Sequence, residues 1–157
     1  NGALMAAVCM LKRPDLFGAV CLNSGVYDML RFNKFTIGWS WTEEYGSPDN
    51  PEDFKILRSY SPLHNVVKNR SYPSTILFTS INDDRVPPFH SYKFAAALQN
   101  AQEKDNPILI RVETKSGHGE GMSNTQLTDE WVEKLYFLVK NLKVERPVEN
   151  QFNTKTH

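Results

Sequence analysis

Short β-branched runs alternate with helical segments along this chain, and this alternation leaves few possible folds. Three runs are predicted to be buried strands: GAVCLNSG at residues 18–25, STILFTSI at 74–81 and NPILIRVET at 106–114. The residues between them carry helical patterns. Strands that alternate with helices form a parallel sheet covered by those helices, because each crossover returns the chain to the same edge. We therefore predict an α/β fold.

Apolar periodicity and helix-start signals predict five helices. The first, NGALMAAVCML at residues 1–11, is apolar nearly all round and is expected to be buried. In the last, Ser123 and Gln126 have the spacing of a capping box. The other three are expected around Asp28 to Phe35, over residues 51–60 and from Pro88 onward. The apolar side chains that recur on one face of the last helix are Leu127, Trp131, Leu135, Leu138 and Leu142.

The chain is interpreted as a piece of a larger domain. Its 157 residues suit one domain, but the predicted sheet is small and the chain opens inside a helix with no strand before it. Residues 1–143 are therefore predicted to be the C-terminal part of a doubly wound, mostly parallel sheet. Residues 144–157 are predicted to be a polar tail.

Composition argues against several classes of protein. Lys plus Arg and Asp plus Glu both number 18, so no net charge favours nucleic acid. No apolar run approaches the roughly 20 residues that span a membrane. Cys9 and Cys21 lie in apolar stretches and are expected to be two buried thiols, with a disulfide left open and a zinc site not expected. Asn1 is not Met, so targeting signals cannot be read from this sequence.

Polar side chains follow the second and third predicted strands. NDDR occupies residues 82–85, and SGHGEG, with a histidine between glycines, occupies residues 116–121. An acid after one strand and a histidine after the next is the order of an α/β-hydrolase triad. The carboxylate would accept the imidazole Nδ1 proton and stabilise the imidazolium that forms during catalysis. The alternative is a solvated aspartate pair and a surface histidine.

The start of the chain, NGALMAAV, looks like the second half of a nucleophile elbow, a sharp turn with the pattern G-x-S-x-G that opens a helix. If a serine precedes Asn1, the backbone N–H of Asn1 becomes an oxyanion donor at a helix N-terminus. The nucleophile itself is then expected immediately upstream of the given sequence.

Several motifs in consecutive order resemble one family. RPDLFGAV, GVYDMLRF, KFTIGWSW, YSPLHNV, NDDRVPPFHSYKFAAALQ and KSGHGEG resemble the C-terminal half of the peptidase domain of the prolyl oligopeptidase (prolyl endopeptidase) family. The resemblance implies an α/β-hydrolase domain capped by a β-propeller, which this chain does not contain. It also implies a serine peptidase that cleaves short peptides after proline and needs no metal or organic cofactor.

The same resemblance implies the surroundings of the enzyme. Its partners would be proline-containing peptides and the rest of the same polypeptide, meaning the upstream hydrolase strands and the β-propeller, and the intact enzyme would be a monomer. Nucleic acid and membranes are not expected as partners. The location would be the cytoplasm, or the periplasm in some bacteria.

Carried over by position, Asp83 would be the triad acid and His118 the base. Arg85 matches an arginine that hydrogen-bonds a substrate carbonyl, and Trp41 matches an indole that stacks on the proline ring. The residues that match other walls of that pocket are Tyr45, Val26 and Val86. Such a pocket suits proline, whose ring is flat and apolar. The alternative for Trp41 and Tyr45 is ordinary core packing.

Three other functions remain open. A member of the same family could act as a peptide macrocyclase or transpeptidase, because the balance depends on water access to the acyl-enzyme. A peptidase of basic specificity would place acids in the pocket, and Glu43 and Glu44 lie in that region. The last alternative is a catalytically dead fragment kept for binding.

Overall fold

A parallel three-stranded sheet lies at the centre of the molecule. The computed structural model describes residues 1–119 and 121–144. The strands β1 (Ala19–Asn23), β2 (Ser74–Ser80) and β3 (Ile108–Glu113) are hydrogen-bonded in the order β1-β2-β3, all parallel. The register places Cys21 beside Ile76 and Leu77 beside Ile110. The predicted strands and their parallel direction are confirmed.

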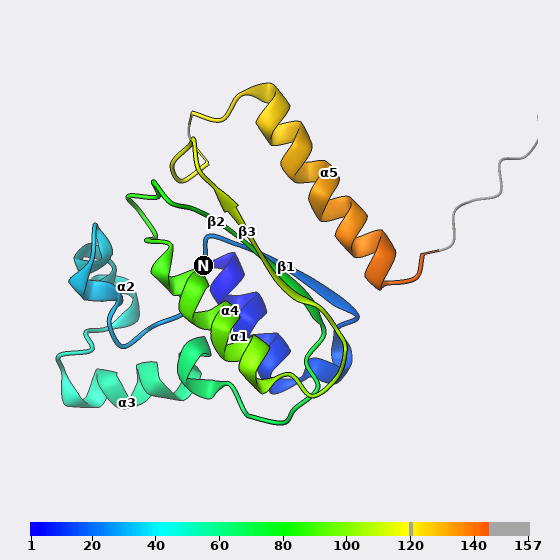
Figure 1. The fold of residues 1–157 in the computed structure, drawn as a ribbon. Helices are drawn as coiled ribbons and strands as arrows, with labels where there is room; N and C mark the ends of the chain where they lie inside the picture. Colours follow the sequence, from blue (N-terminus) through cyan, green and yellow to red (C-terminus); the bar gives the residue numbers. More distant parts are fainter. Residues whose placement is uncertain (120, 145–157) are drawn as a thin grey trace, which may run out of the picture.

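Helices cover both faces of this sheet (Figure 1). The helices α1 (Gly2–Lys12) and α4 (Phe89–Ala101) lie against one face, and α5 (Asn124–Asn141) lies across the other. The side chains of β2 alternate accordingly. Leu77 packs in the cluster that includes Met10 and Phe94, whereas Phe78 packs with Phe137 of α5. This three-layer arrangement is an α/β fold, as predicted.

A smaller helical region extends to one side of the sheet (Figure 1). It contains α2 (Thr42–Tyr45) and α3 (Pro51–Tyr60). The start of α3 follows from its sequence: the Asn50 side chain accepts the N–H groups of Glu52 and Asp53, and Pro51 occupies the first helical position. Short 3₁₀ turns lie at Pro14–Leu16, Phe32–Lys34, Gly38–Trp41 and Pro62–Asn65.

The helix expected around Asp28 to Phe35 is wrong, because only the turn Phe32–Lys34 forms there. The first two backbone N–H groups of this segment donate to side chains that are distant in the sequence. The N–H of Asp28 donates to Nδ1 of His90 (3.1 Å), and the N–H of Met29 donates to Oγ of Ser61 (3.0 Å). These two N–H groups would have no partner within a helix either. Further along, the N–H groups of Arg31 and Lys34 donate three residues back, so the segment is a series of tight turns and not an α-helix.

The first helix is not buried all round. Leu4, Ala7 and Leu11 face inward, but Met5 is 66% exposed. The prediction of two buried thiols is also wrong, since Cys9 is exposed and Cys21 is half-buried, and both are free. Because α1 forms an outer layer, only the stripe that faces the sheet loses contact with water.

The last helix begins as predicted but turns an unexpected face outward. Ser123 and Gln126 form the capping box. The predicted apolar stripe, however, lies largely at the surface, with Trp131 61% and Leu135 56% exposed. The helix meets the sheet through Phe137 and through Lys134, whose Nζ lies 4.9 Å from the centre of the Phe78 ring.

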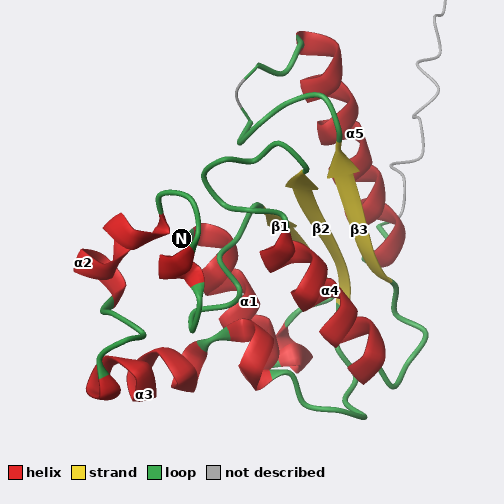
Figure 2. Ribbon diagram, turned by 60° about the vertical axis from the view of Figure 1, so that its left-hand side comes forward, coloured by secondary structure: helices red, strands yellow, loops and turns green. Residues whose placement is uncertain are grey.

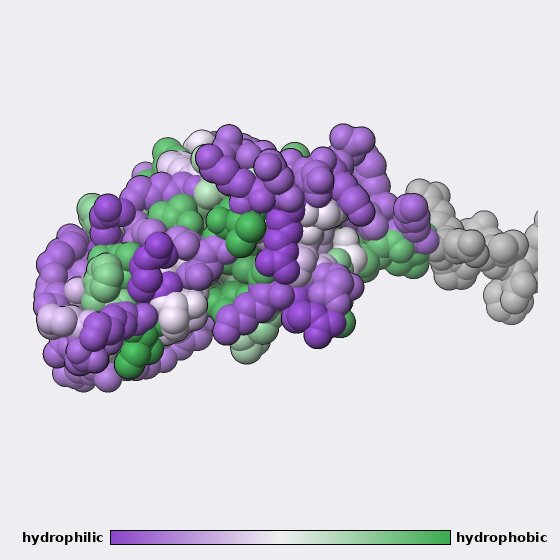
Figure 3. All heavy atoms as spheres, turned by 90° about the horizontal axis from the view of Figure 1, so that it is seen from below, coloured by the Kyte–Doolittle hydropathy of each residue, from purple (hydrophilic) through white to green (hydrophobic). Residues whose placement is uncertain are grey.

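Apolar side chains also reach the surface on the face in Figure 3, where they form patches between polar groups. Within residues 1–119 and 121–144, no helix is long and apolar enough to cross a bilayer. Of the predicted polar tail at 144–157, residues 145–157 lie outside the described part of the chain.

Candidate active site

Asp83 and His118 meet at one edge of the sheet. Asp83 follows β2 and His118 follows β3, and Figure 2 shows that the carboxyl ends of these neighbouring strands lie side by side. The Nδ1 atom of His118 lies 2.7 Å from Oδ2 of Asp83. A carboxylate can only accept, so the imidazole donates from Nδ1 and its neutral form carries the lone pair on Nε2. This tautomer is the one that a general base requires.

The Asp83 carboxylate is held rigidly. Its side chain is fully buried, and Oδ1 accepts the backbone N–H groups of Arg85 (3.0 Å) and Val86 (2.7 Å). The neighbouring Asp84 is exposed. The DDR sequence therefore makes a turn in which the first aspartate points inward and the second points to solvent.

The two loops are also tied to each other. The Ser80 hydroxyl donates to the backbone carbonyl of Ser116. Oγ of Ser80 also accepts the N–H of Asn82 at 3.2 Å. Beyond the histidine, Gly119 has a φ of 82°, which side chains rarely tolerate. Glycine is therefore needed at position 119 for backbone geometry and not for a close approach, since a Cβ there would meet nothing within 4 Å.

A cavity of about 390 Å³ opens beside the histidine. It brings together seven of the eight site residues predicted from the sequence, and Asp83 is hydrogen-bonded behind His118. The lining residues are Asn1, Ser24, Val26, Trp41, Glu44, Tyr45, Arg85, Val86 and His118. The structure therefore gathers residues that are more than one hundred positions apart in the sequence.

The aromatic wall of this cavity is supported from behind by Phe32. The rings of Phe32 and Trp41 are stacked with centroids 6.4 Å apart, and Tyr45 meets Phe32 edge-on at 5.6 Å. Val26 and Val86 pack in the same apolar cluster. The cavity therefore has an aromatic wall next to two aliphatic side chains, which is suited to a small apolar ring.

Asn1 lines the same cavity at the start of α1. Its carbonyl accepts the N–H of Met5 at 2.9 Å, which begins the helix. Its side chain donates from Nδ2 to Oε1 of Glu44 at 2.7 Å and accepts from the Tyr45 hydroxyl at Oδ1. Burial, together with the charges of Glu44 and Tyr60, raises the pKa of Tyr45 to about 12, so its phenol remains a donor.

Ser24 also lines the cavity, although it was not predicted as a site residue, and so does Glu44, which the sequence suggested only for a peptidase of basic specificity. Ser24 follows β1 directly and has a φ of 43°. Its position at the carboxyl end of a parallel strand is a signal that could have identified it. Glu44 precedes Tyr45 in α2, but nothing in the local sequence shows that its carboxylate reaches Asn1.

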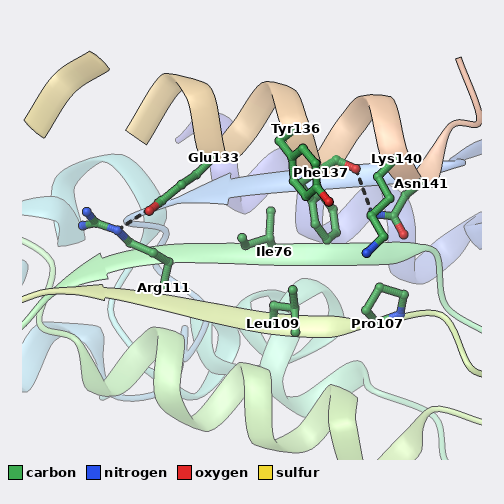
Figure 4. Close-up of a pocket in the computed structure, with 9 residues that line it drawn as sticks. All are labelled: Ile76, Pro107, Leu109, Arg111, Glu133, Tyr136, Phe137, Lys140 and Asn141. Carbon is green, nitrogen blue, oxygen red and sulfur yellow. Dashed lines mark hydrogen bonds and ion pairs between the residues drawn. The ribbon is translucent and has the colours of Figure 1, made fainter. Parts of the chain in front are cut away.

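A second hollow, of about 290 Å³, lies between α5 and the sheet (Figure 4). It is mainly apolar, with Ile76, Leu109 and Phe137 in its walls, and Arg111 is paired with Glu133 at 3.1 Å on its rim. Its lining residues include no histidine, serine or cysteine. Among residues 1–119 and 121–144, no three His, Cys, Asp or Glu side chains lie together as metal ligands.

Comparison with known proteins places the whole arrangement in one family. The profile of the prolyl oligopeptidase family matches residues 1–145. A prolyl endopeptidase of Elizabethkingia miricola is 48% identical over 149 residues, which cover 91% of this chain and 21% of that protein. A dual function macrocyclase-peptidase of Amanita bisporigera is 43% identical over 148 residues, covering 92% of this chain and 20% of that protein.

The fold agrees with these sequence matches. A solved prolyl endopeptidase structure superposes with a TM-score of 0.89 at 38% identity, covering 92% of this chain and 21% of that one. The chain therefore spans about one fifth of the length of the relatives that it matches.

Proposed function

The chain belongs to the prolyl oligopeptidase family, and on that premise we propose that the complete protein is a serine peptidase that cleaves short peptides on the carboxyl side of proline. The observation that carries the proposal is the hydrogen-bonded pair of Asp83 and His118 beside a cavity walled by Trp41 and Tyr45. An acid–base pair and an aromatic wall thus meet at one cavity.

In this proposal the nucleophile is the serine immediately before Asn1 in the complete polypeptide. The position of Asn1 supports it, because Asn1 and His118 line the same cavity. The serine oxygen forms a bond to the carbonyl carbon of the proline residue while Nε2 of His118 takes the hydroxyl proton. Asp83 stabilises the imidazolium, and the backbone N–H of Asn1 donates to the oxyanion.

Collapse of the tetrahedral intermediate breaks the C–N bond, and His118 returns the proton to the leaving amine. Water then attacks the acyl-enzyme with His118 again acting as base, which releases the new carboxylate and restores the serine. Each step uses side chains, one backbone amide and water. The proposed mechanism therefore requires no metal and no organic cofactor.

Recognition of proline is assigned to the cavity walls. Trp41 would stack on the ring, and Tyr45, Val26 and Val86 would close around it, which suits a residue without an N–H to satisfy. Arg85, which also lines the cavity, would donate to a substrate carbonyl. Glu44 gives little support to basic specificity, because its carboxylate already accepts from Asn1.

The rest of the same polypeptide is the main proposed partner. The upstream hydrolase strands would pair with the open edge of β1, which in the described part of the chain is hydrogen-bonded only to β2. We place the β-propeller of the resemblance in that upstream part, and we take the intact enzyme to be a monomer. We propose the cytoplasm as its location, or the periplasm in a bacterium whose full sequence has a signal peptide.

Peptide macrocyclisation is a second candidate, favoured by the 43% identity to a dual function macrocyclase-peptidase. Both reactions pass through the same acyl-enzyme and differ in whether water or the amine of the substrate attacks it. Mass analysis separates them, because the cyclic product weighs one water less than the linear one.

The test uses the complete protein and matched peptides with proline, alanine or lysine before the scissile bond. We expect cleavage after proline and a loss of kcat of about 10³-fold or more in His118→Ala. Turnover that survives this substitution would overturn the triad assignment. A preference for lysine would overturn the assignment of the pocket to proline.

A further inference from the structure

Asn1 occupies the N-cap of α1, yet its side chain makes no capping hydrogen bond. Asparagine is among the most favoured N-cap residues because its carboxamide oxygen usually accepts an N–H from the first turn. Asn50, the N-cap of α3, makes this usual capping bond. The Asn1 carboxamide is therefore engaged elsewhere, although its local position suits a cap.

Its partners come from α2, more than forty residues away. Nδ2 donates to Oε1 of Glu44 at 2.7 Å, and Oδ1 accepts from the Tyr45 hydroxyl. A carboxylate cannot donate, so Glu44 must face the NH₂ group of the carboxamide, and the oxygen must face Tyr45. These two contacts fix one orientation of the Asn1 side chain.

The α2 segment that supplies both partners is itself anchored. The Thr42 hydroxyl donates to the carbonyl of Trp39 at 2.8 Å, and the N–H of Gly46 closes the turn onto the carbonyl of Thr42 at 3.0 Å. Beyond Gly46, the N–H of Ser47 donates to Asp53 of α3 at 2.9 Å. Glu44 and Tyr45 thus project from a backbone that is tied at both ends.

We propose that Glu44 and the Tyr45 hydroxyl are positioning residues that hold Asn1 through its carboxamide, so that its backbone N–H stays aligned with the oxyanion. This inference rests on the proposed function. An oxyanion donor stabilises the transition state only if it is held close to the position of the developing charge. These hydrogen bonds also connect the proposed proline pocket to the oxyanion donor, because the Tyr45 ring forms a wall of the pocket and its hydroxyl donates to Asn1.

The chain offers a matched set of variants for the test. Glu44→Ala removes the acceptor, and Glu44→Gln keeps an acceptor oxygen for Nδ2 while it removes the charge. Glu43→Ala is the control, because Glu43 is exposed, adjacent, of the same charge and absent from the cavity lining. Tyr45→Phe keeps the aromatic wall and removes only the hydroxyl.

Each variant is made in the complete protein and assayed with a proline peptide amide and a non-proline activated ester. We expect Glu44→Ala to lower kcat about 10-fold on both substrates with KM little changed, since both reactions develop an oxyanion. Glu44→Gln should retain most of kcat, and Glu43→Ala should match the wild type. The effects of Glu44→Ala and Tyr45→Phe should be less than additive in the double variant, because both act on one carboxamide.

Binding of a peptidyl-prolinal provides a second measurement, because its aldehyde forms a tetrahedral adduct with the serine. We expect Glu44→Ala to weaken binding of the aldehyde in proportion to the loss in kcat. The affinity for a product peptide that ends in proline should not change. A change in KM alone, or equal weakening of aldehyde and product, would overturn the inference. Failure of the wild type to cleave after proline would instead overturn the proposed function, whatever the variants do.

Discussion

At the scale of single residues, two adjacent aspartates with the same chemistry have opposite environments. Asp83 is buried and accepts from two backbone amides and from His118, whereas Asp84 is exposed. The difference arises from the turn that begins at the end of β2, because the first aspartate accepts the N–H groups of the residues two and three positions later. Asp84 is therefore a matched control for substitutions of Asp83.

We predict that Asp83→Asn lowers kcat of the complete enzyme about 10³- to 10⁴-fold, whereas Asp84→Asn changes it less than about twofold. At position 83 the amide oxygen of asparagine would take over the two backbone N–H groups. Its NH₂ would then face Nδ1 of His118 and hold the proton on Nε2, the wrong tautomer for a base. Steady-state kinetics on a proline peptide checks this, and comparable losses in both variants would contradict the assignment of Asp83 as the acid.

At the scale of elements, His90 of α4 holds the segment that follows β1. Its ring is 1% exposed, and Nδ1 accepts the N–H of Asp28 at 3.1 Å. The carboxylate of Asp28 is also buried. Burial alone would raise the pKa of that carboxyl, but the hydrogen bond and charge of Lys93, helped by His64 and Arg31, hold the pKa below its usual value. Val26, two residues before Asp28, is a wall of the cavity. The hydrogen bond from the Asp28 N–H to His90 therefore links α4 to the site.

Burial lowers the pKa of His90 to about 4, and the lowering outweighs the opposing charges of Asp28 and Asp83. The unfolded chain binds a proton at this histidine below about pH 6.5, whereas the folded state does so only near pH 4. Between these values the unfolded state holds more protons, so stability falls as pH falls. The loss from this group reaches at most about 3 kcal/mol.

We therefore predict that His90→Asn reduces the acid sensitivity of the complete protein. Asparagine keeps an acceptor for the N–H of Asp28 but does not titrate. Denaturation midpoints of wild type and variant, measured at pH 7 and pH 4.5, provide the test. The gap between wild type and variant should shift in favour of the variant at the lower pH. Burial also lowers the pKa of His64. This histidine is present in both proteins, so its contribution to the pH dependence cancels in the difference between them. Parallel pH profiles would show that His90 does not titrate as proposed.

At the scale of the whole molecule, α5 presents apolar side chains to solvent. The stripe includes Leu127, Trp131 and Leu135, and the apolar hollow of Figure 4 lies beneath the same helix. An exposed apolar face of this extent is typical of a surface that another structure covers. The relatives are about five times longer than this chain, so their remaining residues offer such a cover.

We predict that this face is buried in the complete protein. Leu135→Glu should then destabilise the complete protein by about 2 kcal/mol, because a charge replaces a buried leucine. In the isolated 157-residue chain the same change should reduce self-association and binding of a hydrophobic dye. Thr125→Glu, an exposed site on the same helix, is the control and should change neither property. If Leu135→Glu left the complete protein as stable as the wild type, the face would be solvent-exposed there as well.

The strands, their parallel order and the succession of acid and histidine could be predicted from the sequence. These features depend on local patterns: β-branched runs form strands, and polar clusters mark where the strands end. The capping box of Ser123 and Gln126 is equally local. Adjacent parallel strands then bring Asp83 and His118 to one edge without further information.

Features whose partners lie far away in the sequence could be established only from the folded chain. The N–H groups of Asp28 and Met29 donate to His90 and Ser61 of distant elements. The Asn1 carboxamide leaves its capping position for Glu44 and Tyr45. The exposure of the apolar stripe of α5 could not be predicted either, because periodicity identifies such a stripe but not what covers it. Local patterns record the preferences of a segment, whereas its neighbours in the folded chain decide which groups satisfy its hydrogen bonds and which face meets water.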